Sequence, residues 1–245
     1  MKIVLAMITI NRMEFDLTDE KRSGKNYINQ TMQSLDRSGL WGSSTPYELH
    51  VYDGGSKDLS FIEPQWRNRM QLHTIDKKIL PRENCGRAII DATNYGGDWI
   101  MFLEDDIAVC KDFLDAAASW IERNVNEQHR VLTFYTPYRE VQEAVLRGVE
   151  LWHYPVLAFY GTQAIAIRTS DAQSCGDHIH DDVEYSPQSY DLSLKRWHMN
   201  NYPDHGHFLA TAPCFVQHTG EDSALNPGRF HACQSFIGED WRPNG

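Results

Sequence analysis

Several features that would quickly assign this sequence to a class of protein are missing from it. The five cysteines are odd in number, widely spaced and without a C-x-x-C pair, so neither a structural zinc site nor a disulfide framework is indicated. We expect free thiols in a reducing cytoplasm. No apolar run reaches the roughly 20 residues that a membrane-spanning helix needs. We therefore expect a cytoplasmic protein with no transmembrane segment.

Positive charge is also scarce. Lys and Arg total 23 against 34 Asp and Glu, which gives a net charge of -11. Proteins that grip polyanions through their whole surface are basic, so this balance disfavours nucleic acid as a partner. A local basic patch that includes Arg168, Lys195 and Arg196 would be needed to reverse that expectation. The motifs G-x-x-x-x-G-K-S/T and G-x-S-x-G are absent, which argues against a P-loop NTPase and an α/β-hydrolase.

What is present in the first half is an alternation of strands and helices. An apolar run from Lys2 to Ile10 predicts a strand covered on both faces. Further strands are predicted at 48–52, 70–75 and 99–103, and helices at 26–38, 87–95 and 112–125, the last with Asp112 as its N-cap. Such alternation is typical of an α/β fold with a mostly parallel sheet flanked by helices.

The second half is less regular. Short strands are predicted at 163–167 and 214–217, a helix at 191–199, and a loop between Asp177 and Tyr185 that carries surface histidines. The 245 residues suit one domain, which we divide into two halves, 1–125 and 126–245.

Polar residues follow three of the predicted strands where each strand ends. They are Asn11-Arg12, the Asp53–Ser56 turn, and the triplet Glu104-Asp105-Asp106. Ligands bind beyond the carboxyl ends of the strands in open α/β sheets, so these clusters predict the binding edge. Three adjacent carboxylates repel one another unless a positive group lies among them. Mn²⁺ or Mg²⁺ with a phosphate-bearing ligand would meet that need; a solvated loop or a helix cap is the alternative.

The order of motifs around the triplet carries a resemblance. Asp53-Gly54-Gly55-Ser56 is followed by Glu83–Ala88, by Ala92–Gly97 and then by the apolar strand that ends in the triplet. This resembles the GT-A-fold glycosyltransferases, most closely their inverting family 2 branch. There a D-G-S turn, an N-x-G-x-A segment and an A-x-N-x-G helix end lead into a strand closed by D-x-D. The resemblance covers about residues 1–125 and implies a Rossmann-like GT-A sheet with a nucleotide-sugar-binding first half.

The resemblance implies roles on the donor side. Asp53 would hydrogen-bond the base of the nucleotide, and Ile10, Asn11 and Arg12 would line the base and ribose pocket. Arg87 would meet the ribose or the diphosphate. Without the acidic triplet, Asp53 would be explained as a turn former and Arg87 as a surface charge.

It also implies roles at the metal. Asp106 would bind the metal, while Glu104 or Asp105 would hold the sugar or ribose; glutamate at 104 departs from the first aspartate of D-x-D. His218 follows a late strand, where several GT-A families place a histidine that completes the metal shell or touches the diphosphate. A neutral imidazole is a competent Mn²⁺ ligand, although a lone histidine is as readily structural.

The catalytic base is expected in the second half, which would bind the acceptor. Tyr190–Trp197 resembles the E-D-x-x-L-x-x-R helix start of the same branch, with Tyr190 replacing glutamate, so Asp191 would be the base. A carboxylate at a helix N-terminus stays ionised and can accept the proton of an attacking hydroxyl. The alternative is that Asp191 only caps its helix. Asp181 and Asp182 are the reserve candidates for the base.

The expected function is that of a metal-dependent glycosyltransferase of the hexosyltransferase type. It would move a sugar from a nucleotide-diphosphate donor, expected to be a UDP-sugar, to an acceptor hydroxyl with inversion. The acceptor stays open among a glycan, a lipid-linked sugar, a protein and a hydroxylated base of viral DNA. A sugar-nucleotide nucleotidyltransferase is disfavoured because the loop Thr9–Arg12 contains no glycine. A non-catalytic nucleotide- or carbohydrate-binding module is the other alternative.

Overall fold

The computed structural model describes residues 1–14, 25–182, 189–220 and 232–243. Within them, eight strands form one sheet in the order β3-β2-β1-β4-β8-β6-β9-β7, and β5 pairs with β10 in a separate two-stranded sheet. The strands are β1 (Ile3–Thr9), β2 (Tyr47–Asp53), β3 (Gln71–His73), β4 (Trp99–Leu103), β5 (Ile107–Val109), β6 (Val131–Thr133), β7 (Leu151–Pro155), β8 (Ala164–Arg168), β9 (His207–Thr211) and β10 (Val216–His218). The α-helices are α1 (Ile28–Arg37), α2 (Pro64–Arg67), α3 (Pro81–Ala92), α4 (Phe113–Asn124), α5 (Arg139–Leu146), α6 (Thr169–Asp181) and α7 (Tyr190–Asn201).

The large sheet is mixed but mostly parallel, as the sequence predicts. Strands β3, β2, β1 and β4 run parallel to one another, and β6 runs parallel to β9. Strand β8 is antiparallel to both β4 and β6, and β7 is antiparallel to β9. Because β8 reverses direction, the residues just before it lie beside the carboxyl end of β4.

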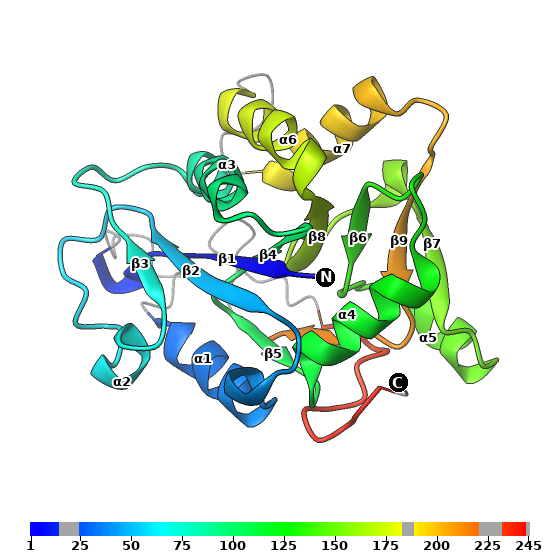
Figure 1. Ribbon diagram of the computed structural model, residues 1–245, viewed down its shortest axis with the longest axis horizontal. Coiled ribbons are helices and arrows are strands. Elements are labelled where there is room, and N and C mark those ends of the chain that lie inside the picture. Colours follow the sequence, from blue (N-terminus) through cyan, green and yellow to red (C-terminus); the bar gives the residue numbers. More distant parts are fainter. Residues whose placement is uncertain (15–24, 183–188, 221–231, 244–245) are drawn as a thin grey trace.

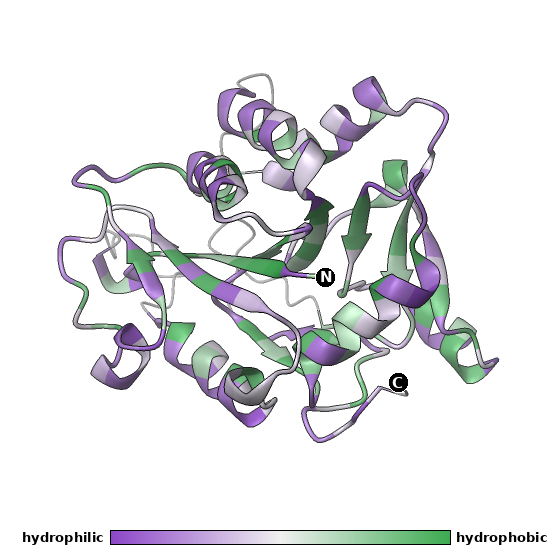
Figure 2. Cartoon of the chain, viewed as in Figure 1, coloured by the Kyte–Doolittle hydropathy of each residue, from purple (hydrophilic) through white to green (hydrophobic). Residues whose placement is uncertain are grey.

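Helices cover both faces of this sheet. Figure 1 shows α1, α2 and α4 on one face and α3, α6 and α7 on the other. Strand β1 supplies both cores by alternation: Ile3, Leu5 and Met7 pack on the α1 and α4 side, while Val4 and Ala6 pack on the α3 and α6 side. Figure 2 shows hydrophobic residues gathered on the strands and hydrophilic residues on the outer turns of α6 and α7. This burial on both faces explains why the run that forms β1 is apolar without interruption.

Helices α3 and α6 cross at a pair of glycines. A Cβ built on Gly86 would lie 2.7 Å from the carbonyl oxygen of Gly176, and one on Gly176 would lie 3.0 Å from the carbonyl oxygen of Gly86. The two backbones therefore meet without side chains between them. This contact joins the helix that precedes β4 to the helix that follows β8, which links the two halves of the chain.

The structure corrects several of the predicted elements. The helix predicted at 87–95 begins earlier, at Pro81, and continues after Ala92 as a 3-10 turn. The predicted loop between Asp177 and Tyr185 is wrong up to Asp181, because α6 extends to that residue; residues 183–185 lie outside the described part of the chain. Asp112 occupies the N-cap position of α4, but its side chain makes no capping hydrogen bond.

Two other expectations concern the whole chain. All five cysteines fall within the described residues, and each is a free, buried thiol. None of the helices in the described ranges is long and apolar enough to cross a membrane.

Candidate functional site

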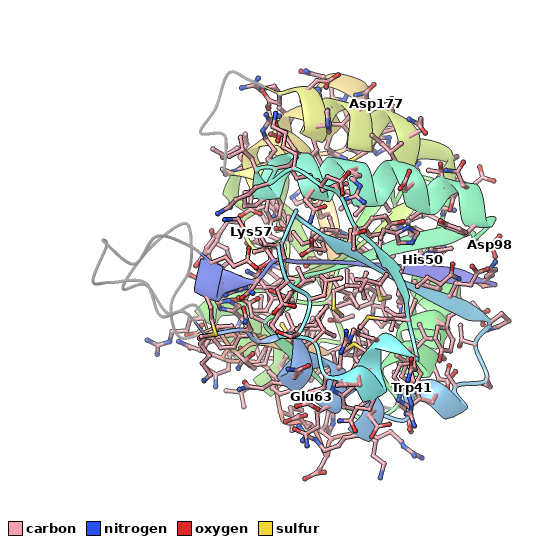
Figure 3. All side chains as sticks on the ribbon, turned by 90° about the vertical axis from the view of Figure 1, so that its left-hand side faces the viewer. Trp41, His50, Lys57, Glu63, Asp98 and Asp177 are labelled. Atoms are coloured by element: carbon pink, nitrogen blue, oxygen red, sulfur yellow. The ribbon has the colours of Figure 1, made fainter. Side chains whose placement is uncertain are left out.

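The three polar clusters that follow strands meet at one edge of the sheet. Thr9, at the end of β1, pairs with Asp53 at the end of β2, and Met7 pairs with Leu103 at the end of β4. Backbone contacts continue beyond the strands, because Gly54 N donates to the Thr9 carbonyl at 2.9 Å. In Figure 3, Lys57, beyond the carboxyl end of β2, lies at the opposite end of the sheet from Asp98, which precedes β4. The three clusters therefore lie at one edge of the sheet, and ligand binding there stays a prediction.

Asp53 forms the turn that follows β2. One of its carboxylate oxygens accepts hydrogen bonds from the backbone N–H groups of Gly55 at 2.9 Å and Ser56 at 2.7 Å, and the other accepts from the Ser56 hydroxyl. Arg87, half-buried on α3, donates from Nη1 to the Asp53 carbonyl at 3.1 Å, and its guanidinium lies 5.5 Å from the centre of the Tyr52 ring. Both residues thus lie at the binding edge, and their contacts with a nucleotide remain predictions.

Ile10 and Asn11 fill the space between this turn and the loop after β1. The Ile10 side chain would lie 3.4 Å from a Cβ built on Gly54. Asn11 is buried; its amide donates to the Glu14 carboxylate at 3.0 Å and accepts from Asn26 Nδ2 at 3.0 Å. These contacts order the loop that carries Arg12, the next residue.

The acidic triplet is held by contacts from three separate elements. Glu104 N donates to the Gln163 carbonyl at 3.0 Å, just before β8, and Thr219 N donates to the Asp106 carbonyl at 2.8 Å, just after β10. The Thr31 hydroxyl of α1 donates to the Asp105 carbonyl at 2.8 Å. These bonds satisfy backbone groups in a buried loop, where unpaired polar groups would cost free energy. The backbone that carries the three carboxylates is therefore held in place by these hydrogen bonds.

A positive group does lie among these carboxylates, and it is Arg12. Its Nη2 lies 2.6 Å from Asp105 Oδ1 and 3.1 Å from Asp106 Oδ2. The Thr9 hydroxyl donates to the other oxygen of Asp105 at 2.6 Å. The resemblance places Arg12 in the base and ribose pocket, whereas in this structure its guanidinium pairs with the triplet.

Glu104, Asp106 and His218 form a group that could hold a metal ion. One ligand atom from each lies within 4.8 Å of the others, and His218 Nε2 is 3.3 Å from Asp106 Oδ2. The antiparallel pairing of β10 with β5, in which His218 faces Ile107, brings the histidine to the triplet. Carboxylate oxygens and an imidazole nitrogen are a suitable donor set for Mn²⁺, and the carboxylates suit Mg²⁺.

Two further observations fit a cation at this place. Asp106 Oδ1 is buried and has no hydrogen-bond partner among the residues that the structure describes, although buried polar atoms are nearly always paired. Gly220 leaves the space beside the ligands open: a Cβ built there would lie 2.6 Å from Asp106 Oδ2 and 2.8 Å from His218 Nε2. The residues present therefore fit a divalent ion.

The electrostatics of the group follow from burial and from these pairs. Burial alone would raise the pKa of Asp106, but the charge of Arg12 and the hydrogen bond with His218 outweigh it and hold that pKa well below its ordinary range. Burial and repulsion by Asp106 raise the pKa of Glu104 to about 7. Burial would lower the pKa of His218, yet its hydrogen bond and ion pair with Asp106 raise it. Negative charge is thus concentrated on Asp106.

Asp191 lies in the first turn of α7, as predicted. Its Oδ2 accepts a hydrogen bond from Gly161 N at 3.1 Å, and its Oδ1 accepts one from the Thr162 hydroxyl at 2.7 Å. The same hydroxyl lies 3.1 Å from Glu104 Oε1, which also accepts from the Tyr190 hydroxyl at 2.6 Å. Thr162 and Tyr190 therefore connect Glu104, of the candidate metal group, to the predicted base.

The reserve candidates for the base lie differently. Asp182 is buried and ion-paired with Arg196 at 2.9 Å, and Asp181 is exposed beside His180. Arg168 is also engaged, donating to the carbonyls of Asn126 and His129.

Sequence reasoning missed the contributions of Thr162, Tyr190 and Gly220. Thr162 lies on a connection whose place beside Glu104 depends on the reversed direction of β8, which no local pattern shows. Gly220 lies two residues after His218, but only the packing against Asp106 reveals why a side chain is excluded there.

Comparison with known proteins supports the fold. Neither a protein-family model nor a curated protein matches the sequence. Among solved structures, S. aureus TarS in complex with UDP-GlcNAc superposes with a TM-score of 0.54 at 16% identity, covering 86% of this chain and 56% of that one. TarS 1-349 in complex with UDP gives 0.53 at 17%, over 86% and 58% of the two chains.

A longer TarS structure gives a TM-score of 0.57 at 16% identity and covers 90% of this chain and 37% of that one. The chain thus spans between 37% and 58% of the TarS chains it matches. At such identities the likeness concerns the fold, and the sheet order and its helical layers agree with it. The chain therefore has a GT-A-like fold, which it shares with these TarS structures.

Proposed function

We propose that this protein is a divalent-metal-dependent glycosyltransferase that moves a sugar from a UDP-sugar to an acceptor hydroxyl. One observation carries the proposal. Asp106 and His218, 3.3 Å apart, and Asp191, linked to Glu104 through the Thr162 hydroxyl, lie together at the carboxyl edge of a GT-A-like sheet. That arrangement puts acidic ligands, a nitrogen ligand and a separate carboxylate at the edge where α/β sheets bind nucleotides.

The donor assignment draws on the binding edge and on the comparisons. TarS structures hold UDP and UDP-GlcNAc, which supports the same class of donor here. Asp53, Ile10, Asn11 and Arg87 are the residues we assign to the base, the ribose and the diphosphate. The first half, residues 1–125, would then bind the donor.

Glu104, Asp106 and His218 would hold the metal. A bound Mn²⁺ or Mg²⁺ would supply positive charge to the phosphate oxygens of the departing UDP. The position of Glu104 is controlled by Tyr190, which donates to its carboxylate at 2.6 Å. The charge on Asp106 is favoured by the guanidinium of Arg12.

Asp191 is the base in this proposal. Its carboxylate is oriented by Gly161 N and by the Thr162 hydroxyl. It would accept the proton of the acceptor hydroxyl as that oxygen attacks the anomeric carbon. A single displacement assisted by one base inverts the anomeric centre. Residues 126–245, which contain Asp191, would supply the acceptor side.

The acceptor stays open among a glycan, a lipid-linked sugar, a protein and a hydroxylated base of viral DNA. The net charge of -11 disfavours a nucleic acid. Arg196 and Arg168, which a basic patch would need, are already engaged with Asp182 and with backbone carbonyls.

The proposal is tested by donor turnover. The protein is incubated with a panel of UDP-sugars with and without Mn²⁺, and released UDP is measured alongside an Asp106→Ala variant. We expect metal-dependent UDP release that the variant loses, while Asp204→Ala, a change at an exposed loop position, keeps it. Tight nucleotide-sugar binding without turnover would instead favour a binding module. Formation of a UDP-sugar from UTP and a sugar 1-phosphate would favour a nucleotidyltransferase.

A further inference from the structure

Arg12 contacts a carboxylate that a metal ion would also need. Its Nη2 lies 3.1 Å from Asp106 Oδ2, and the same oxygen lies 3.3 Å from His218 Nε2. A cation bound between Asp106 and His218 would therefore share that carboxylate with the guanidinium. The side chains of Arg12 and Asp106 are 14% and 5% exposed, so water screens their charges poorly. Two positive groups on one buried carboxylate repel each other.

Arg12 is also well placed to change partners. Its guanidinium lies 4.9 Å from the centre of the Tyr27 ring, and its backbone N–H donates to Asn26 Oδ1 at 2.7 Å. The backbone is thus anchored, whereas the guanidinium is held by carboxylates and one ring. A planar guanidinium binds phosphate oxygens as readily as carboxylates, through paired hydrogen bonds.

We propose that Arg12 is a resident counter-cation that competes with the divalent ion for Asp105 and Asp106, and that the phosphates of the donor relieve this competition by accepting the guanidinium. The inference rests on the proposed function, because it assumes a metal site and a nucleotide diphosphate at this edge. It has a consequence for binding order: the metal alone binds weakly, and the nucleotide strengthens metal binding. Because such coupling is reciprocal, the metal strengthens nucleotide binding by the same factor.

The test measures Mn²⁺ affinity directly, without turnover. Free Mn²⁺ is titrated by electron paramagnetic resonance against wild type and Arg12→Gln, each with and without UDP. We expect Arg12→Gln to bind Mn²⁺ alone at least about tenfold more tightly than wild type, the equivalent of about 1.4 kcal/mol. We also expect UDP to tighten Mn²⁺ binding by a larger factor in wild type than in the variant. Arg37→Gln, which removes the same charge from a half-exposed surface pair with Glu239, should match wild type.

Melting temperature gives a second readout. Without Arg12 the carboxylates of Asp105 and Asp106 lack their cation, so Mn²⁺ alone should raise the melting temperature of Arg12→Gln by more than that of wild type. If that variant does not fold, Arg12→Lys keeps the charge but loses the planar fork. The Mn²⁺ affinity of Arg12→Lys should be higher than that of wild type and lower than that expected for a chain without a positive charge at position 12.

Two results would overturn the inference. Mn²⁺ affinity without UDP that is unchanged or weaker in Arg12→Gln, or in Arg12→Lys if the first variant is unfolded, would contradict the competition. If wild type still binds Mn²⁺ with UDP in that case, the proposed function stands and only the role of Arg12 falls. If wild type binds no Mn²⁺ even with UDP, both the inference and the metal-dependent function are rejected.

Discussion

The hydroxyl of Tyr190 donates a 2.6 Å hydrogen bond to Glu104 Oε1, which ties the first turn of α7 to the tip of β4. The Tyr190 side chain is buried, and its ring packs edge-on against Phe102 at 5.9 Å between centroids. Glu104 therefore has a fixed partner that reaches it from the half of the chain that also carries Asp191.

Removal of that hydroxyl should weaken the site while sparing the fold. Tyr190→Phe keeps the ring packed against Phe102 but removes the shortest side-chain hydrogen bond to Glu104. We expect kcat/KM for UDP-sugar turnover to fall by about tenfold, which corresponds to about 1.4 kcal/mol. Steady-state kinetics measure the loss, and circular dichroism checks the fold. Wild-type kinetics in a folded Tyr190→Phe would show that Glu104 needs no such partner.

A methyl group at Gly220 should close the metal site. The added Cβ would lie 2.6 Å from Asp106 Oδ2 and 2.8 Å from His218 Nε2, closer than non-bonded atoms approach, so both ligands must shift. We expect Gly220→Ala to lose at least about tenfold in Mn²⁺ affinity, as measured by calorimetry with UDP present. Gly206→Ala is the matched control, because a Cβ there meets nothing within 4 Å. Equal Mn²⁺ affinities in the two variants would place the metal elsewhere.

Replacement of Asp191 should separate chemistry from binding. Asparagine retains the shape and can still accept the bond from the Thr162 hydroxyl, but it cannot take up a proton. We expect Asp191→Asn to lose about 10²–10⁴-fold in kcat for sugar transfer while its Kd for UDP stays near that of wild type. Normal transfer by this variant would mean that another group is the base.

Asp115 should contribute to stability through hydrogen bonds that require its charge. On α4, its Oδ1 accepts from the Thr45 hydroxyl at 2.7 Å and from the Ser43 hydroxyl at 2.8 Å. Burial would raise its pKa, but these bonds lower it from 3.8 to about 2. A lowered folded-state pKa stabilises the protein above pH 3.8, and this contribution is lost as the pH falls toward 2.

The corresponding variant is Asp115→Asn. After allowance for solvent screening, we expect it to lower the free energy of unfolding by about 1 kcal/mol at neutral pH. Urea titrations should show the stability difference between wild type and Asp115→Asn shrinking as the pH falls from 3.8 to about 2. The control Asp204→Asn, at an exposed position, should have the stability of wild type. A difference that does not depend on pH would exclude the charge as its cause.

Local patterns in the sequence were sufficient for the first half of the sheet. The buried strand at Trp99–Leu103 was predicted with its observed bounds, because a strand covered on both faces must be continuously apolar. The placement of Asp53 and the triplet at the same edge of the sheet followed from strand direction alone. The short strands β6 and β9 carry no such signal: β6 has three residues, and their places depend on pairing with β8 and with each other.

Residues of the candidate site could be named from the sequence, but their pairings could not. The repulsion among the three carboxylates indicated that a cation was needed, and it could not reveal that Arg12 already supplies one. The bonds from Tyr190 and Thr162 to Glu104 span 86 and 58 residues of sequence, and such distant contacts are fixed by packing rather than by local preference. His218 reaches Asp106 only because β10 pairs with β5.

The most direct test is a crystal of the protein soaked with MnCl₂ and UDP, with anomalous diffraction collected near the manganese edge. The expected result is an anomalous peak in contact with Asp106 and His218 and with the phosphates of UDP, beside Glu104. UDP bound with no manganese at these side chains, or manganese bound elsewhere on the protein, would contradict a metal-dependent transferase centred on this triplet.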